Sequence, residues 1–343
     1  MPSRQWLLAM ACIALLTFGG APAWAHSNAG SEKATTPTLI RDIASQLVGS
    51  LSARTNQIGA PNGGGGGSQG IMNLTPTSSS GRSGAAALKD TALWANTSYT
   101  SLENDNIFTA YDGHAVAAMI GLDTRVIDPL TVGVAFGYEN IDLDTTFNQG
   151  SLKWNGYSVT PYAVFRFLNN YSFDVSGSYA RLNNDVTRIN NAAKGSFDSD
   201  RWTADANLNG GWNVGNWRLG ATVGYLYLHQ NDGSYRENGL GNALVGSQTT
   251  EVGQGRAGIR VGYDLGKIEP YLKGRVEHEF TSPGRTVVAP GVFVSSDTTG
   301  YVLGGGALFR LSDQLSGGLE ATTTQGREHQ DIWGVSGTIR FRF

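Results

Sequence analysis

The chain has 343 residues, 47 of them glycine, a formal net charge of −3, one cysteine, and only 15% charged residues. The small net charge excludes an electrostatically driven nucleic-acid binder, and one cysteine excludes a disulfide scaffold within the chain. Because glycine eases the bends of a closing sheet, its abundance favours a strand-rich protein.

Residues 1–25 have the pattern of a secretory signal peptide. Arg4 supplies a short basic region, residues 6–18 form an apolar core, and residues 23–25 (Ala-Trp-Ala) fit a cleavage site. We therefore expect the mature chain to begin at His26. The only cysteine, Cys12, lies inside this signal, so no thiol chemistry is expected in the mature protein.

Residues 26–91 divide into a helical part and a linker. From Thr38 to about Thr55, apolar residues recur with a helical period: Leu39, Ile40, Ile43, Leu47, Val48 and Leu51. Five successive glycines at 63–67, followed by Ser, Thr and Pro, predict a flexible Gly/Ser-rich linker over 57–89.

From Ala92 to Phe343 the chain alternates apolar and polar residues with the period of β-strands. Twelve strands are expected, at 92–101, 114–126, 130–144, 152–168, 171–188, 196–213, 217–231, 250–265, 268–280, 299–311, 314–326 and 332–343. Their connections alternate between short turns and long loops. An apolar outside, a polar inside and this alternation predict an all-β fold, a 12-stranded antiparallel transmembrane barrel in the outer membrane of a Gram-negative cell.

Strand parity assigns a set of charged residues to the lumen of this barrel. In lipid, each such charge would cost about 2–4 kcal/mol at mid-bilayer. The expected lumen-facing charges are Lys267, Glu269, Lys273, Arg275, Glu277, Glu279, Arg256, Arg260, Arg340 and Arg342. They either pair around a segment inside the barrel, which we favour, or line a selective pore.

Aromatic residues and histidines are expected near the rims. Interfacial girdles are expected to include Trp154, Trp202, Trp212, Trp217 and Trp333. Besides His26, the mature histidines are His114, His229, His278 and His329, and candidate catalytic pairs are Asp112 with His114 and Glu328 with His329. Spacing fixes no nucleophile or base, so hydrated rim residues are the favoured interpretation. No enzyme activity, metal or cofactor is predicted.

Residues 92–343 resemble the translocator β-domain of autotransporters, the type V secretion family. The resemblance rests on Leu93-Trp94, residues 118–138, residues 156–162, residues 256–263 with 269–271, and the terminal Phe343. It implies a 12-stranded barrel with a helical segment through its pore, which carries an N-terminal passenger across the outer membrane. It also implies periplasmic chaperones and the barrel-assembly machinery as partners, an assembly signal at Phe341 and Phe343, and a monomeric barrel in lipid.

The region upstream of the barrel departs from this family because residues 26–91 hold no repeat and no catalytic motif. We therefore expect a vestigial passenger or a pore plug. Small residues fit a narrow lumen best, so Ala85, Ala86 and Ala87 are expected inside the barrel and the helix at 38–55 outside it. The favoured function is a translocator that exports or displays its N-terminal segment. A passive channel, or an enzyme or adhesin acting through loops 232–249 and 281–298, are the alternatives.

Overall fold

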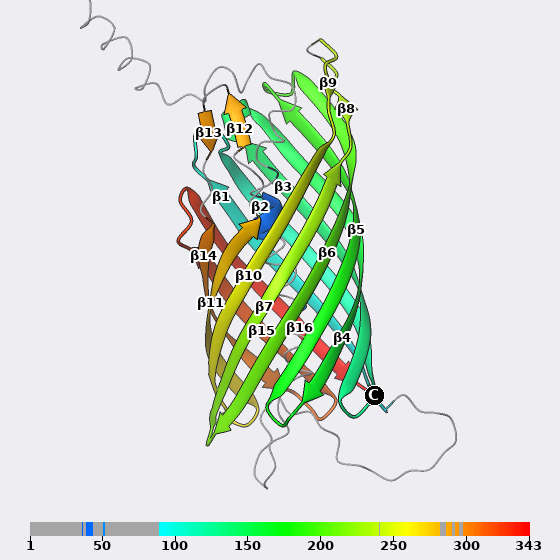
Figure 1. Cartoon of the computed structure of the whole chain (residues 1–343), viewed down its shortest axis with the longest axis vertical. Helices are drawn as coiled ribbons and strands as arrows, with labels where there is room; N and C mark the ends of the chain where they lie inside the picture. Colours follow the sequence, from blue (N-terminus) through cyan, green and yellow to red (C-terminus); the bar gives the residue numbers. More distant parts are fainter. Residues whose placement is uncertain are drawn as a thin grey trace, which may run out of the picture.

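The computed structural model is a closed barrel of twelve antiparallel strands (Figure 1). It describes residues 36, 39–43, 51, 89–239, 241–281, 286–289, 292–294 and 298–343. The predictions of a signal peptide over 1–25, of a Gly/Ser-rich linker and of Ala85–Ala87 in the pore lie outside the described residues. Among the described residues, no helix is long and apolar enough to cross a membrane.

The strands follow one another around the wall in chain order. They are β1 (Lys89–Asn104), β2 (Tyr111–Ile127), β3 (Leu130–Thr145), β4 (Gly150–Phe167), β5 (Tyr171–Arg188), β6 (Ala193–Val214), β7 (Trp217–Asp232), β10 (Gln248–Tyr263), β11 (Ile268–Thr281), β14 (Thr299–Arg310), β15 (Leu315–Gln325) and β16 (Gln330–Arg342). Pairing of β1 with β16 closes the sheet. At the end of this seam, the backbone N–H of Phe343 donates to the carbonyl oxygen of Thr91 at 3.0 Å. The predicted 12-stranded barrel is confirmed.

The two ends of the barrel differ in their connections. The short-turn end, where the C-terminus also lies, has the turns 128–129, 168–170, 215–216, 264–267 and 311–314. The long-loop end has the connections 105–110, 146–149 (with the 3-10 helix η2, Thr146–Asn148), 189–192, 233–247, 282–298 and 326–329. Two of these loops contain small hairpins that strand periodicity did not predict: β8 (Tyr235–Arg236) with β9 (Leu244–Val245), and β12 (Thr286–Ala289) with β13 (Val292–Val294).

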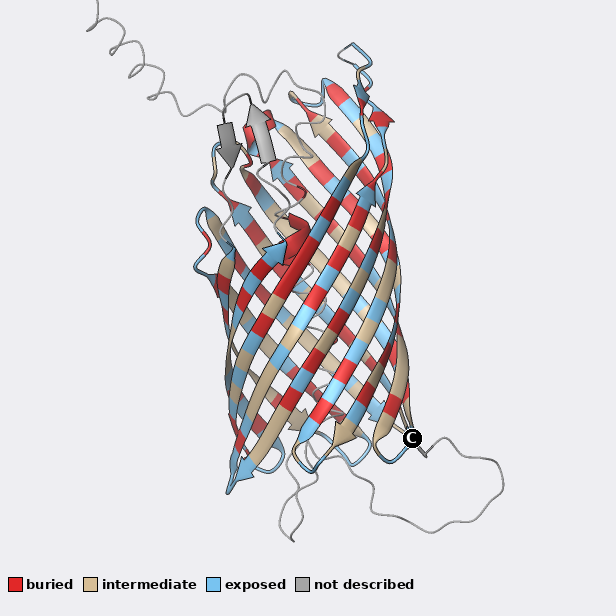
Figure 2. Cartoon of the chain, viewed as in Figure 1, coloured by how far each residue is buried: buried red, intermediate tan, exposed pale blue. Residues whose placement is uncertain are grey.

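Outward-facing side chains form an apolar band around the barrel. On β6 the band runs from Trp202 to Trp212, ten residues apart. At a rise of about 3.3 Å per residue and a tilt of about 40°, this length spans about 25 Å along the barrel axis, the height expected of an outer-membrane barrel. Figure 2 shows buried and exposed residues alternating along the strands, as the two-residue period requires.

Towards the long-loop end, the polarity of the two faces inverts. On β3, Tyr138 is exposed on the outer face, but Ile141 and Leu143 on the inner parity are fully buried, and Asp142 faces out. Beyond the band, water replaces lipid outside the wall, so the outer face becomes polar and apolar side chains turn inward. For the same reason Trp154 on β4 is buried inside the barrel. Its prediction as a girdle residue was wrong.

These inward apolar side chains form a ring, the inner collar. Its members are Leu102, Tyr111, Ile141, Leu143, Leu152, Trp154, Val186, Phe197, Leu226, Leu228, Val252 and Ile332. They come from β1 to β7, β10 and β16. Among the described residues, β11, β14 and β15 contribute none to this cluster, so the inner collar is interrupted on that side of the lumen.

Candidate functional site in the barrel lumen

Residues from upstream of the barrel occupy its lumen. They are Thr36, Leu39–Ile43 and Leu51, all helical and buried, and we call them the lumen segment. Leu39, Ile40 and Ile43 belong to the same buried cluster as the inner collar. The short blue helix inside the wall in Figure 1 is this part of the chain. The helix was predicted to lie outside the barrel, and that prediction was wrong.

The inner collar explains this correction. The prediction assumed a polar lumen that would exclude a bulky apolar helix face. The lumen is instead apolar at the level of the inner collar, where the side chains of Leu39, Ile40 and Ile43 are at most 3% exposed. Burying such a side chain contributes about 1.5–3 kcal/mol. The hydrophobic effect therefore favours the helix inside the barrel.

The lumen segment has a defined direction along the barrel. Leu51 packs in a second buried cluster with Trp94, Ala135 and Tyr162. Trp94 and Ala135 lie near the starts of β1 and β3, which are at the short-turn end. The inner collar lies at the long-loop end. The segment therefore has its N-terminal residues at the long-loop end and its C-terminal residues nearer the short-turn end.

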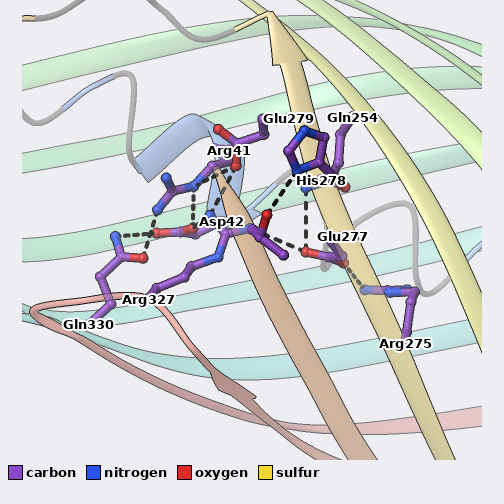
Figure 3. A network of polar contacts seen from close by, with 10 residues as sticks. Arg41, Asp42, Gln254, Arg275, Glu277, His278, Glu279, Arg327 and Gln330 are labelled. Carbon is purple, nitrogen blue, oxygen red and sulfur yellow. Dashed lines mark hydrogen bonds and ion pairs between the residues drawn. The ribbon is translucent and has the colours of Figure 1, made fainter. Parts of the chain in front are cut away.

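Arg41 and Asp42 lie in the interruption of the inner collar, within a network of polar contacts that we call the mouth network (Figure 3). Arg41 Nε is 2.9 Å from Asp42 Oδ1 and 3.3 Å from Glu279 Oε1. Arg41 Nη2 donates to Gln330 Oε1 at 2.6 Å, and Gln330 Nε2 donates to Asp42 Oδ2 at 3.1 Å. Arg327 Nη1 lies 3.5 Å from Asp42 Oδ1. Three elements of the wall, β11, the 326–329 turn and β16, thus hold two successive residues of the segment.

The charged wall residues of the mouth network also pair with one another. Arg327 contacts Glu279 at 3.0 Å and Glu277 at 3.3 Å. Glu277 also pairs with Arg275 at 2.6 Å and accepts a hydrogen bond from Gln254 at 3.3 Å. The network thus combines three guanidinium groups with three carboxylates. Because all but Arg275 have side chains at most 3% exposed, removing one partner would leave an uncompensated buried charge.

The other predicted lumen charges lie nearer the short-turn end. Arg260 pairs with Glu269 at 2.8 Å and Lys273 with Glu320 at 2.6 Å. Arg256 forms a buried ion pair with Asp205, and Arg340 and Arg342 are half-buried on the inner parity of β16. Lys267 is exposed in the turn 264–267 and does not enter the lumen, because β11 begins one residue later.

Sequence reasoning also missed buried ion pairs outside the predicted set of lumen charges. Arg201 on β6 contacts Glu139 on β3 at 3.0 Å and lies over the ring of Trp154 at 5.7 Å. In one of the long loops, Glu237 pairs with Arg188 at 2.6 Å and both side chains are buried. The inward parity of Glu139, Arg188 and Arg201 on their strands was the available signal, but their pairing depends on the barrel closing.

The histidines His114, His229, His278 and His329 each contact a neighbouring side chain at the outer face or the rim of the barrel. His229 contacts Glu251 at 3.1 Å, His278 contacts Thr299 at 2.8 Å, His329 contacts Asp105 at 2.6 Å, and His114 stacks on Tyr99 at 5.6 Å. None of these contacts includes the third group of a nucleophile–base–acid arrangement. Within the described part of the chain, no group of three or more His, Cys, Asp or Glu side chains is placed to hold a metal ion.

Comparison with known proteins identifies relatives of the barrel. A family model described as "Autotransporter beta-domain" matches residues 93–322. The translocator domain of the autotransporter NalP from Neisseria meningitidis is 15% identical, with a TM-score of 0.64 over 75% of this chain and 90% of that chain. The β-domain of the Bordetella autotransporter BrkA is 18% identical, with a TM-score of 0.58 over 73% of this chain and 98% of that one. The transport unit of AIDA-I from Escherichia coli is 13% identical, with a TM-score of 0.59 over 74% and 90%. No curated protein matches the chain.

Proposed function

The chain belongs to the autotransporter β-domain family, its barrel is an outer-membrane barrel, and we propose that this barrel exports and displays the chain's own N-terminal segment. The direction of the lumen segment carries the proposal. In outer-membrane barrels the long loops are extracellular and the short turns periplasmic. Leu39–Ile43 lie at the long-loop end and Leu51 nearer the short-turn end. This direction supports exit of the residues before Thr36 on the cell surface.

Closure of the lumen favours a translocator over a passive channel. The inner collar holds Leu39, Ile40 and Ile43 on one side of the lumen segment, and the mouth network holds Arg41 and Asp42 on the other. We expect a lumen occupied by the helix at this level to conduct ions poorly. In the proposed pathway, residues 1–25 act as a cleaved signal peptide. Periplasmic chaperones and the barrel-assembly machinery deliver the chain to the membrane, where the barrel stays monomeric.

Surface labelling tests the proposal. A cysteine introduced by Ser27→Cys, upstream of the lumen segment, should react in intact cells with a thiol reagent that does not cross the outer membrane. Leu244→Cys in the exposed β8–β9 hairpin provides a matched surface control. Asp313→Cys in the exposed turn 311–314 provides a periplasmic control and should react only after the membrane is permeabilised.

The two controls define the outcomes of this experiment. Labelling of Ser27→Cys together with Leu244→Cys supports display on the surface. Labelling of Ser27→Cys only under the conditions that label Asp313→Cys would place the N-terminal segment in the periplasm and overturn the proposal.

A further inference from the structure

The apolar contacts of the lumen segment do not by themselves define one position. Leu39, Ile40 and Ile43 touch the inner collar, whose apolar side chains extend around most of the lumen. Apolar contact is not directional, and its free energy follows the area removed from water. A small slide or rotation of the helix would keep these side chains inside the ring.

The charged contacts, in contrast, depend on position. Arg41 meets Glu279 at 3.3 Å, and Asp42 meets Arg327 at 3.5 Å. A one-residue shift moves a helix by about 1.5 Å along its axis and about 100° around it. Such a shift would separate both pairs or bring like charges together, and it would turn the charged side chains towards the inner collar.

Burial makes this position dependence strong. The side chains of Arg41, Asp42, Glu279 and Arg327 are at most 3% exposed. A buried charge that loses its partner keeps the full cost of desolvation. A buried ion pair adds little net stability over a well-packed apolar pair, and fixing register is its best-attested role.

Gln330 adds a contact that spans both charged residues of the segment. Its side-chain amide accepts from Arg41 at 2.6 Å and donates to Asp42 at 3.1 Å. Gln330 is the first residue of β16, the strand that closes the barrel. The segment is therefore held by the barrel wall as well as by the 326–329 turn.

We propose that the mouth network is a register stop. It fixes the depth and the rotation at which the segment halts in the barrel, and the residues that specify this position are Arg41 and Asp42 on the segment with Glu279 and Arg327 on the wall. The inference rests on the proposed export function, in which the segment moves through the lumen before it halts.

A cross-link near the other end of the segment reports its register. Leu51 and Ala135 belong to one buried cluster, so Leu51→Cys with Ala135→Cys should react with a short thiol cross-linker. The measurement is made on the purified full-length barrel, scored only in the folded, heat-modifiable form. It does not depend on whether the N-terminus reached the cell surface.

Exchanging the two charges of the segment tests the stop. The double change Arg41→Asp with Asp42→Arg keeps the composition, the net charge and the apolar positions, but it places each charge against a like charge of the wall. Cross-linking should fall by at least about tenfold, which corresponds to about 1.4 kcal/mol. The matched control exchanges an exposed pair on the outer face, Lys153→Asp with Asp142→Lys, and should leave cross-linking unchanged.

Exchange on the wall supplies a rescue. Adding Glu279→Arg and Arg327→Glu to the segment exchange restores opposite charges at both contacts. A fifth change, Glu277→Gln, removes the wall carboxylate that Arg327 contacts at 3.3 Å, so that no like charges meet there. Cross-linking should then recover. Unchanged cross-linking after the segment exchange, or no recovery in the fivefold variant, overturns the register stop. Normal cross-linking with an N-terminus that cannot be labelled at the surface counts instead against the export function, so the two failures are distinguishable.

Discussion

Arg41 Nη2 donates a hydrogen bond to Gln330 Oε1 at 2.6 Å and thereby ties the lumen segment to the last strand of the barrel, 289 positions away in the sequence. The same strand, β16, closes the barrel against β1. Docking of the segment and closure of the sheet therefore share one strand. Truncation of the Arg41 side chain should consequently weaken the whole barrel and not only the helix.

The first prediction concerns Arg41→Ala. The change removes the cation closest to Asp42 and one of the two cations that contact Glu279. Among the described residues, Arg327 is then the cation that still contacts both buried carboxylates. The free energy of unfolding should fall by about 3–5 kcal/mol, as for other broken buried ion pairs. Urea titration of the barrel in lipid vesicles measures it.

Lys153→Ala is the matched control for this measurement. Lys153 pairs with Asp142 at 2.7 Å on the outer face, where both side chains are largely exposed. An exposed pair of this kind contributes at most about 1 kcal/mol. An effect of Arg41→Ala no larger than that of Lys153→Ala would contradict a structural role for the mouth network.

The second prediction concerns Ile40→Ala in the lumen segment. Ile40 is 1% exposed in the cluster with the inner collar, and truncating such a side chain costs about 2–5 kcal/mol. Weaker docking should leave the lumen open for a larger fraction of the time, which appears as more frequent channel openings in planar bilayers. Leu244→Ala, at an exposed hairpin position, serves as the control. An opening frequency equal to that of the control would mean that the inner collar does not hold the helix.

The third prediction tests which face of β11 meets lipid. Leu272 is 72% exposed on the outer face, four residues after the start of β11. Leu272→Arg should therefore lower the free energy of unfolding in lipid by about 2–4 kcal/mol. Leu244→Arg places the same new charge in the β8–β9 hairpin, and it should change stability by at most about 0.5 kcal/mol. Equal effects of the two changes would place Leu272 outside the lipid-facing band.

The fourth prediction concerns assembly. The ring of Phe343 stacks edge-on against Phe341 at 5.2 Å, and its backbone donates to Thr91 at 3.0 Å across the seam. Deleting Phe343 removes an interfacial aromatic ring and the last hydrogen bond of closure, so less heat-modifiable barrel should accumulate in the outer membrane. Phe280→Ala, equally exposed near the other end, should have a smaller effect. Normal barrel levels in the deletion strain would argue against Phe343 as an assembly signal.

The fifth prediction concerns the β8–β9 hairpin. Glu237 pairs with Arg188 at 2.6 Å, and Tyr235 stacks on Phe197 at 5.1 Å. Glu237→Ala leaves a buried guanidinium without this partner, so residues 235–245 should exchange amide hydrogens faster while the barrel strands keep their protection. The neighbouring exposed residue gives the control, Arg236→Ala. Unchanged exchange in Glu237→Ala would show that other contacts hold the hairpin.

Most of the barrel could be predicted from local sequence. The two-residue period, interrupted by turns such as 128–129 and 215–216, located all twelve barrel strands to within a few residues. This success has a physical basis: each membrane-spanning strand must present an apolar face to lipid, and that requirement acts on every strand separately.

The lumen could not be predicted in the same way. The position of the helix depends on the inner collar, which forms only when inward residues of nine strands meet in the closed barrel. One local signal did exist on β3, where apolar residues pass from the parity of Tyr138 to that of Ile141 and Leu143. This inversion marks the level at which the strand leaves the lipid, and it predicts an apolar interior beyond that level.

The direction of the lumen segment, with its N-terminal residues at the long-loop end, is tested most directly by paired cysteines in native outer membranes. Ile43→Cys should cross-link to Leu102→Cys in the cluster of the inner collar, and Leu51→Cys should cross-link to Ala135→Cys in the cluster nearer the short turns. The crossed pairs, Ile43→Cys with Ala135→Cys and Leu51→Cys with Leu102→Cys, should not react. Cross-linking of the crossed pairs, or of no pair in a folded barrel, would contradict the direction on which the export function rests.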